Sequence, residues 1–369
     1  MVEEKESNKA KMITISLCMI VKNEEDILER CLSCVEGIAD EIVIVDTGST
    51  DRTKEIASRF TDRIYEYEWK DDFGAARNYS FSKATKEYCM WLDADDVIPE
   101  EERKKLRCLK KGMTDQVDVV MIRYATAFDE EGKPVFFYYR ERIVKNDGRF
   151  FWQGRVHEAI VPEGNVFYAD ACIFHRKNRP SDADRNLRIY ENMLRAQEIL
   201  GPREQFYYGR ELYYHEKWQE AAKAFEIFLL EEDSFLENRI DACRLLAACR
   251  RNLGDMKGAY EALFASFCYD TPRAETCCDL GAMFLNANLL EQSVYWYERA
   301  LEAGKKERSG GFIEEDCYGY LPSIGLCMCH DRLGNHRKAF SYNEKAATYK
   351  PKDRYVALNR KYFREKWGM

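Results

Sequence analysis

The chain has 369 residues, of which 46% are hydrophobic and 13% aromatic, and its formal net charge is −8 at pH 7. This length predicts two domains that can each bury a core, and the acidic balance argues against a nucleic-acid-binding protein. No apolar run approaches the ~20 residues of a membrane span, so no transmembrane segment is expected. Residues 1–12 lack the apolar stretch of a secretory signal, and we expect a loose tail on a cytoplasmic protein.

The 14 cysteines do not follow the spacing of a zinc site or of a disulfide framework. Cys31 and Cys34 form a CxxC pair, but they lie within an apolar helical pattern. Cys327 and Cys329 also lie in a helical pattern, and no second pair stands at zinc-ligand spacing. In a reducing compartment such cysteines are small core residues, which is the role that we predict for them.

Short apolar segments alternate with helical patterns in the first hundred residues. Strand-like runs cover residues 13–21, 41–46, 63–69 and 89–98, and helical patterns cover 24–37, 49–60 and 71–85. This βαβαβ order predicts an α/β domain with a mostly parallel sheet, and the strand-rich region 118–175 adds further sheet. Ligands of such sheets bind beyond the carboxyl ends of the strands, so the residues that follow each strand are site candidates.

After about residue 180 the strand patterns give way to an internal repeat. Small side chains recur 12 positions apart in four pairs, Gly209 and Ala221, Ala247 and Ala259, Gly281 and Ser293, and Cys327 and Ala339. Paired helices that repeat every ~34 residues are typical of a tetratricopeptide solenoid. The last interval is longer and predicts a loop insertion at 304–319. Residues 350–367 are predicted to cap the solenoid, with a membrane-surface helix as the alternative.

Three carboxylates, Asp93, Asp95 and Asp96, directly follow the apolar residues 89–92. In an extended segment residues i and i+2 point the same way, so Asp93 and Asp95 are expected to face one site. Their hard oxygen ligands suit Mg²⁺ or Mn²⁺, which bridge carboxylates to phosphates and would remove the repulsion within the cluster. The alternative is a helix entry with Pro99 in the first turn and Glu100, Glu101 and Glu102 facing the positive end of the helix, which would explain Asp96 but not the acids that directly follow the buried strand.

Two further side chains suit a nucleotide. Asp46 follows the second strand, and a fixed carboxylate there can accept the N3–H of uracil while discouraging cytosine; the alternative is a cap for the following turn. Arg77 keeps its charge and can fork onto phosphate oxygens, or it can form a salt bridge to Asp71 or Asp72. No GxGxxG motif follows the first strand, which disfavours a dinucleotide-binding fold.

Four segments together resemble the family 2 glycosyltransferases, which have the GT-A nucleotide-sugar fold: VKNEE (21–25), EIVIVDTGSTDRT (41–53), DDFGAARN (71–78) and WLDADD (91–96). The resemblance covers most of the first 100 residues and implies a UDP-sugar donor and a divalent metal ion. It implies a nucleotide-binding set and a metal-binding set. The residues implied to bind the nucleotide are Val21, Asn23, Glu24 and Ala94, together with Asp46 at uracil, Arg77 near the phosphates and Asp93 near the ribose. The residues implied to bind the metal ion are Asp95 and His175. The alternative for His175 is a structural histidine at the boundary of the core.

An inverting transfer also needs a carboxylate that takes the proton of the acceptor. Glu158 lies beside His157 in WQGRVHEAI (152–160), a stretch that resembles the GRxHE of the branch with helical repeats. Glu158 is therefore the candidate base, and a surface strand acid is the alternative. The acid pair that other branches use downstream of the metal motif is absent. Trp152 is expected in the core, with stacking on a sugar as the alternative.

These patterns favour a metal-dependent inverting glycosyltransferase that moves a hexose or N-acetylhexosamine from a UDP-sugar. Similarity to bacterial peptide S-glycosyltransferases with helical repeats favours a peptide or protein acceptor held by the repeats, while glycan or lipid-linked acceptors stay open. An inactive transferase domain on a repeat scaffold is one alternative. An aspartate phosphohydrolase, with Asp93 as nucleophile and Asp95 as acid and base, is another. The expected parts are a tail (1–12), a transferase domain (13–179) and a repeat domain (180–369), and a homodimer stays open.

Overall fold

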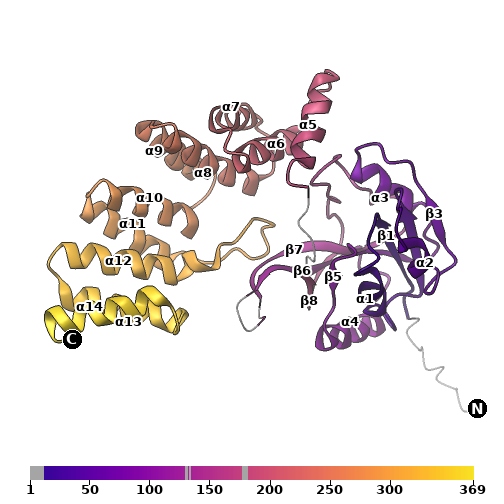
Figure 1. Ribbon diagram of the computed structural model, residues 1–369, viewed down its shortest axis with the longest axis horizontal. Helices are drawn as coiled ribbons and strands as arrows, with labels where there is room; N and C mark the ends of the chain where they lie inside the picture. The colour runs from indigo at the N-terminus through magenta and orange to yellow at the C-terminus, as the bar shows by residue number, and fades with distance from the viewer. Residues whose placement is uncertain (1–11, 129–131, 133, 177–181) are drawn as a thin grey trace, which may run out of the picture. The chain divides into compact units, whose positions relative to one another are not determined.

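The computed structural model describes residues 12–128, 132, 134–176 and 182–369. The chain divides into two compact units, residues 1–198 and 199–369 (Figure 1). The tail that the sequence predicts lies outside the described residues apart from Met12, and so does the predicted domain boundary at 179/180. Within the described part of the chain, no helix combines the length and the apolar character needed to cross a membrane.

The first unit is built on a mixed sheet whose strand order is β3-β2-β1-β4-β7-β6-β8-β5. Strands β1 to β4 pair in parallel, whereas β7 runs antiparallel to both β4 and β6. The strands are β1 Ile15–Val21, β2 Glu41–Asp46, β3 Ile64–Glu66, β4 Tyr88–Trp91, β5 Asp96–Val97, β6 Val119–Phe128, β7 Pro134–Lys145 and β8 Val166–His175. The parallel βαβαβ start and the added strands confirm the architecture predicted for this half.

Helices cover both faces of the parallel strands, which is why those strands are apolar throughout. Leu17 and Met19 of β1 pack in one core with Leu28, Ile56 and Leu106, which belong to three helices on that face. The other face holds a second core with residues from β1, β2 and β4 and from helix α3. The helices are α1 Leu28–Ser33, α2 Thr53–Ala57, α3 Phe73–Phe81, α4 Glu100–Gly112 and, at the end of this unit, α5 Arg185–Arg195.

The second unit consists of paired helices, as the repeat pattern predicts. The first helices of the pairs are α6 Pro202–Tyr214, α8 Leu236–Asn252, α10 Ala274–Asn286 and α12 Tyr320–Arg332, and the second helices are α7 Trp218–Phe228, α9 Met256–Ala265, α11 Leu290–Glu302 and α13 His336–Tyr349. Close approach explains the small residues: a Cβ at Gly281 or Gly325 would lie 2.8 or 2.3 Å from the ring of Tyr297. The hydroxyl of Ser293 donates to the carbonyl of Gly281 at 2.7 Å.

The last helix, α14 Arg354–Trp367, closes the repeat unit. Val356 packs with Ala346 and Ala347, and Phe363 packs with Cys327 and Ala339. These two buried residues place α14 against the preceding pair of helices, and the capping role stays a prediction.

Candidate functional site

A cavity of about 740 Å³ lies in the first unit, beyond the carboxyl ends of β1 and β4. This is the edge of a parallel sheet at which ligands are expected, and the volume is within the range of small-molecule sites. Asp46 is the one predicted site residue outside the lining, although its neighbour Thr47 belongs to it. The predicted residues that line the cavity are Val21, Asn23, Glu24, Arg77, Asp93, Ala94, Asp95, Glu158 and His175.

The acidic segment forms a turn, so the extended conformation predicted for residues 93–96 is wrong. The backbone N–H of Asp96 donates to the carbonyl of Asp93 at 3.0 Å, and the Asp96 carboxylate accepts from the backbone N–H of Asp93 at 3.0 Å. These two bonds close the chain on itself, which an extended strand end cannot do. Asp93 and Asp95 still line the same cavity, but the turn places them there rather than strand alternation.

Asp96 points away from the cavity and forms a buried ion pair with Arg142 of β7. The two side chains are 0% exposed, and Nη1 of Arg142 lies 2.9 Å from the carboxylate. The hydroxyl of Tyr124 donates to the same carboxylate at 2.9 Å, and the guanidinium lies 3.7 Å from the ring of Trp91. The positive partner of Asp96 is therefore supplied by the chain itself, and the helix entry at Pro99 does not account for this acid.

Replacing Arg142 with methionine is expected to lower the free energy of unfolding of the first unit by about 3–5 kcal/mol, because the Asp96 charge would stay buried without its partner. Hydrogen exchange of the β4 amides reports on this unit alone. As a control, Arg149→Met removes an arginine that is 42% exposed beside Asp118 and Asp147 and is expected to cost no more than about 1 kcal/mol. Equal protection of β4 in the two variants would contradict this account.

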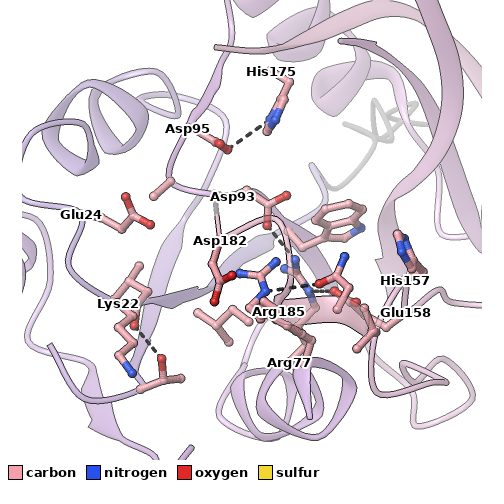
Figure 2. A pocket seen from close by; sticks show the side chains of 18 of the residues that line it. Lys22, Glu24, Arg77, Asp93, Asp95, His157, Glu158, His175, Asp182 and Arg185 are labelled. Carbon is pink, nitrogen blue, oxygen red and sulfur yellow. Dashed lines mark hydrogen bonds and ion pairs between the residues drawn. The ribbon is translucent and has the colours of Figure 1, made fainter. Parts of the chain in front are cut away.

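Arg77 joins Asp93 to Glu158. Its Nη2 donates to Asp93 Oδ1 at 2.6 Å and its Nε donates to Glu158 Oε1 at 2.7 Å (Figure 2). The guanidinium also lies over the rings of Trp91 and Trp152, at 5.0 and 4.8 Å from their centroids. Burial alone would raise the pKa of Asp93, but the charges of Arg77 and then Arg142 outweigh it and lower that pKa to about 2.

The structure also settles the alternatives that the sequence left open for the ion-pair partners of Arg77 and for the place of Trp152. Its ion-pair partners are not Asp71 and Asp72; the carboxylate of Asp72 instead caps α3 by accepting from Ala75 N at 2.8 Å. Trp152 is 3% exposed and packs edge-on against Trp91 at 4.9 Å. Trp152 is therefore a core residue, as the sequence favours.

Asp95 and His175 form a second pair in the same cavity (Figure 2). Nδ1 of His175 lies 3.2 Å from Asp95 Oδ1 and 2.8 Å from the hydroxyl of Tyr124. Burial alone would lower the pKa of His175, but hydrogen bonds to Asp95 and Asp96 outweigh it and raise that pKa to about 9. Ligand atoms of Asp95, Asp96 and His175 lie within 4.8 Å of one another. Since Asp96 is already engaged by Arg142 and Tyr124, the donor set that fits a divalent cation is Asp95 with His175.

Asp46 has the turn-cap role that the sequence left open, and one of its two carboxylate oxygens stays unpaired. Its Oδ1 accepts from the backbone N–H groups of Gly48 and Ser49 at 3.0 and 2.8 Å, which is the predicted turn cap. Its Oδ2 has no hydrogen-bond partner among the described residues although the side chain is 2% exposed. A buried carboxylate oxygen without a donor is costly, and a ligand N–H at the neighbouring cavity would satisfy it.

Sequence reasoning missed several residues that line the cavity. Arg185 of α5 stacks on Phe73 at 4.6 Å, and Phe73 packs edge-on with Trp69 at 4.6 Å. Lys22 and Arg185 have no salt-bridge partner within the ranges that the structure describes, so they bring positive charge to the cavity. Arg185 lies more than 80 residues beyond the acidic turn, in a helical segment that the motif pattern assigned to the repeats, and only the fold brings it here.

The region that holds this cavity matches a known family. Residues 16–165 match the family model "Glycosyl transferase family 2". This match supports the predicted GT-A-type fold of the first unit and agrees with the motifs at its strand ends.

Relatives cover both units in part. SunS, an SPbeta prophage-derived glycosyltransferase of Bacillus subtilis, is 30% identical over 248 residues, 63% of this chain and 58% of the relative. A TPR repeat-containing protein of Synechococcus elongatus is 43% identical over 98 residues, 27% of this chain and 24% of the relative. The chain thus spans less than two thirds of either relative. Among solved structures, S. aureus TarS in complex with UDP is 14% identical, with a TM-score of 0.36, over 68% of this chain and 90% of that one.

Proposed function

We propose that the protein moves a hexose or N-acetylhexosamine from a UDP-sugar to a peptide or protein acceptor, on the premise that residues 16–165, which match the glycosyl transferase family 2 model, act as a transferase domain. One observation carries the proposal: one cavity at the sheet edge holds the pair Asp95–His175 and a carboxylate anchored by Arg77, and its lining includes Thr47, the neighbour of Asp46, whose buried Oδ2 is unsatisfied. These three elements correspond to a base-recognition group, a cation site and a candidate general base.

The nucleotide would be recognised by groups at the ends of β1 and β2. Oδ2 of Asp46 accepts the N3–H of uracil, while its Oδ1 stays held by Gly48 and Ser49. Lys22 and Arg185 favour the negative charge of the diphosphate, because each brings a cation to the cavity and neither has a salt-bridge partner among the described residues. Arg77, in contrast, is engaged by two carboxylates, so its contribution to phosphate binding is indirect.

Asp95 and His175 would hold the divalent cation, Mn²⁺ or Mg²⁺. Such a cation supplies, when bound, Lewis-acid stabilisation of the charge that develops on the departing diphosphate. His175 must give up the proton that its raised pKa favours before its nitrogen can act as a ligand. Tyr124, which contacts both Asp96 and His175, holds the imidazole in place.

Glu158 would take the proton of the acceptor as it attacks the sugar. Its side chain is 11% exposed and lines the cavity. The bond from Arg77 Nε fixes Oε1, so the carboxylate keeps its orientation while its other oxygen can face the acceptor. The phosphohydrolase alternative fits less well, because it needs Asp93 as a free nucleophile and Arg77 holds Asp93 at 2.6 Å.

The nucleotide part is tested by Asp46→Asn. Asparagine keeps the oxygen that caps the turn but replaces Oδ2 with an amide that donates, so UDP should bind at least ~10-fold more weakly. The affinity for CDP should fall less than that for UDP, or should rise, since cytosine N3 accepts a hydrogen bond. Calorimetry with UDP and CDP in the presence of Mn²⁺ measures both. Unchanged UDP affinity in the variant, or no UDP binding by the parent protein, would reject the donor assignment and favour the inactive scaffold.

A further inference from the structure

Residues 303–319, which we call the strap, join α11 to α12 and contain the insertion that lengthens the last repeat (Figure 1). The strap contains one short 3₁₀ turn, Glu315–Tyr318. Residues 304–308 are exposed, whereas Ile313 and Cys317 are buried. The second half of the strap therefore lies against the helices of its own unit.

Two residues of the strap, Phe312 and Glu314, contact three different helices. Phe312 lies under the guanidinium of Arg210 of α6 at 4.2 Å. The carboxylate of Glu314 lies 2.9 Å from Nη1 of Arg244 of α8, and its backbone N–H donates to Oε1 of Glu275 of α10 at 3.0 Å. The strap thus crosses the first helices of three successive pairs in an extended conformation.

This arrangement is how a tetratricopeptide solenoid holds a peptide. Extended segments bind across the first helices of successive repeats, which line the concave face of a solenoid. Here the face offers arginines for an aromatic ring and for a carboxylate, and it offers Glu275 for a main-chain N–H. The contacts of Phe312 and Glu314, together with the burial of Ile313 between them, indicate the side chains that the face accepts.

The strap does not completely fill the space between itself and the helices that it contacts. A small cavity of about 30 Å³ remains beside it, lined by residues that include Asp241, Arg244, Arg273 and Glu275. Arg273 is 8% exposed, yet its Nε and Nη1 have no hydrogen-bond partner in the described part of the chain. The Glu314 side chain is 50% exposed, and ion pairs with exposed partners hold weakly. A ligand that also satisfied Arg273 would bind this face better than the strap does.

We propose that this face is a docking groove for an extended protein segment with an aromatic, an aliphatic and an acidic residue in succession, and that the strap occupies it as an internal mimic. The partner displaces residues 311–314 and takes over their contacts to Arg210, Arg244 and Glu275. Because the strap is tethered, its high effective concentration keeps weak ligands out. Identifying this partner with the acceptor rests on the proposed function; the docking itself does not.

The test uses a labelled peptide of sequence GGFIEED, residues 310–316, and the full chain with Phe312→Ala and Glu314→Ala. The double variant should bind the peptide at least ~10-fold more tightly than the parent protein, because the tethered competitor is weakened. A peptide with Phe changed to Ala, or with the first Glu changed to Lys, should bind neither protein. Fluorescence anisotropy measures all six pairs of peptide and protein. The variant Glu307→Ala, at an exposed strap position, should bind as the parent does.

Equal peptide binding by the double variant and the parent would overturn the proposal. The single variant Glu314→Ala removes only a half-exposed carboxylate, so it keeps the comparison valid if the double variant is unstable. Sugar transfer is not measured in this experiment. Its failure is therefore distinguishable from a failure of the proposed function.

Discussion

Replacement of Asp95 by asparagine is expected to lower UDP-glucose hydrolysis with Mn²⁺ by at least ~10²-fold, because a neutral amide is a poor ligand for a hard cation. Of the three acids in the turn, Asp93 and Asp96 are paired with arginines, and Asp95 is paired only with His175. The substitution should therefore weaken cation binding without destabilising the fold. The thermal shift caused by Mn²⁺ should also disappear.

Two controls make this result specific. Asp170→Asn changes a carboxylate that is 85% exposed on β8 beside Arg123, and it should leave the rate unchanged. Chelation of the metal should slow the parent enzyme about as much as the substitution does, and it should not slow the Asp95→Asn variant further. An Asp95→Asn enzyme that still responds to Mn²⁺ would remove Asp95 from the cation site.

Replacement of Glu158 by glutamine is expected to lower the rate of sugar transfer to water by about 10²–10⁴-fold, the range seen when a general base is removed. Glutamine keeps an oxygen that can accept from Arg77 Nε, so the position of the arginine should be preserved. The KM for UDP-glucose should therefore change little while kcat falls. The decline of the rate at low pH, which reports a base that must be unprotonated, should disappear from the profile.

A fall in kcat with little change in KM distinguishes a general base from a residue that only positions Arg77. If Glu158 acts only by holding Arg77, glutamine should preserve most of kcat. A rise in KM without a change in the pH profile would also contradict the assignment as base. Glu163→Gln, at an exposed position five residues further along, is the matched control and should behave as the parent enzyme.

The motifs identified most of the site before any coordinates, because a parallel sheet collects the ends of its strands at one edge. Nine of the ten predicted residues line the cavity. The base-recognition idea for Asp46 also followed from position alone, since Asp46 ends β2 beside Val21 of β1 in the sheet register. The contacts that each strand-end residue makes could not be predicted from its position.

The partner of Asp96 came from a segment that carries no motif. Arg142 lies on β7 in a stretch, Arg-Glu-Arg, whose charges suggest a solvent-exposed strand, yet its guanidinium is buried beside Asp96. Arg77 and Glu158 are 81 residues apart, and the bond between them changes what each can do. The turn at 93–96 also replaced the predicted extended conformation, because its local hydrogen bonds close the chain on itself.

By itself, the sequence determined the order of an α/β unit and a helical repeat unit, the resemblance of the first unit to a known transferase family, and the sheet edge at which the cavity lies. Hydrophobic periodicity and spacing are local properties of the chain, so they can be recognised without coordinates. Only the tertiary structure decided which charges neutralise one another, with Asp95 and His175 left as a pair in the cavity, and what the strap covers. Those outcomes depend on distances between residues far apart in the chain, and electrostatic interactions are set by distance and burial rather than by order in the sequence.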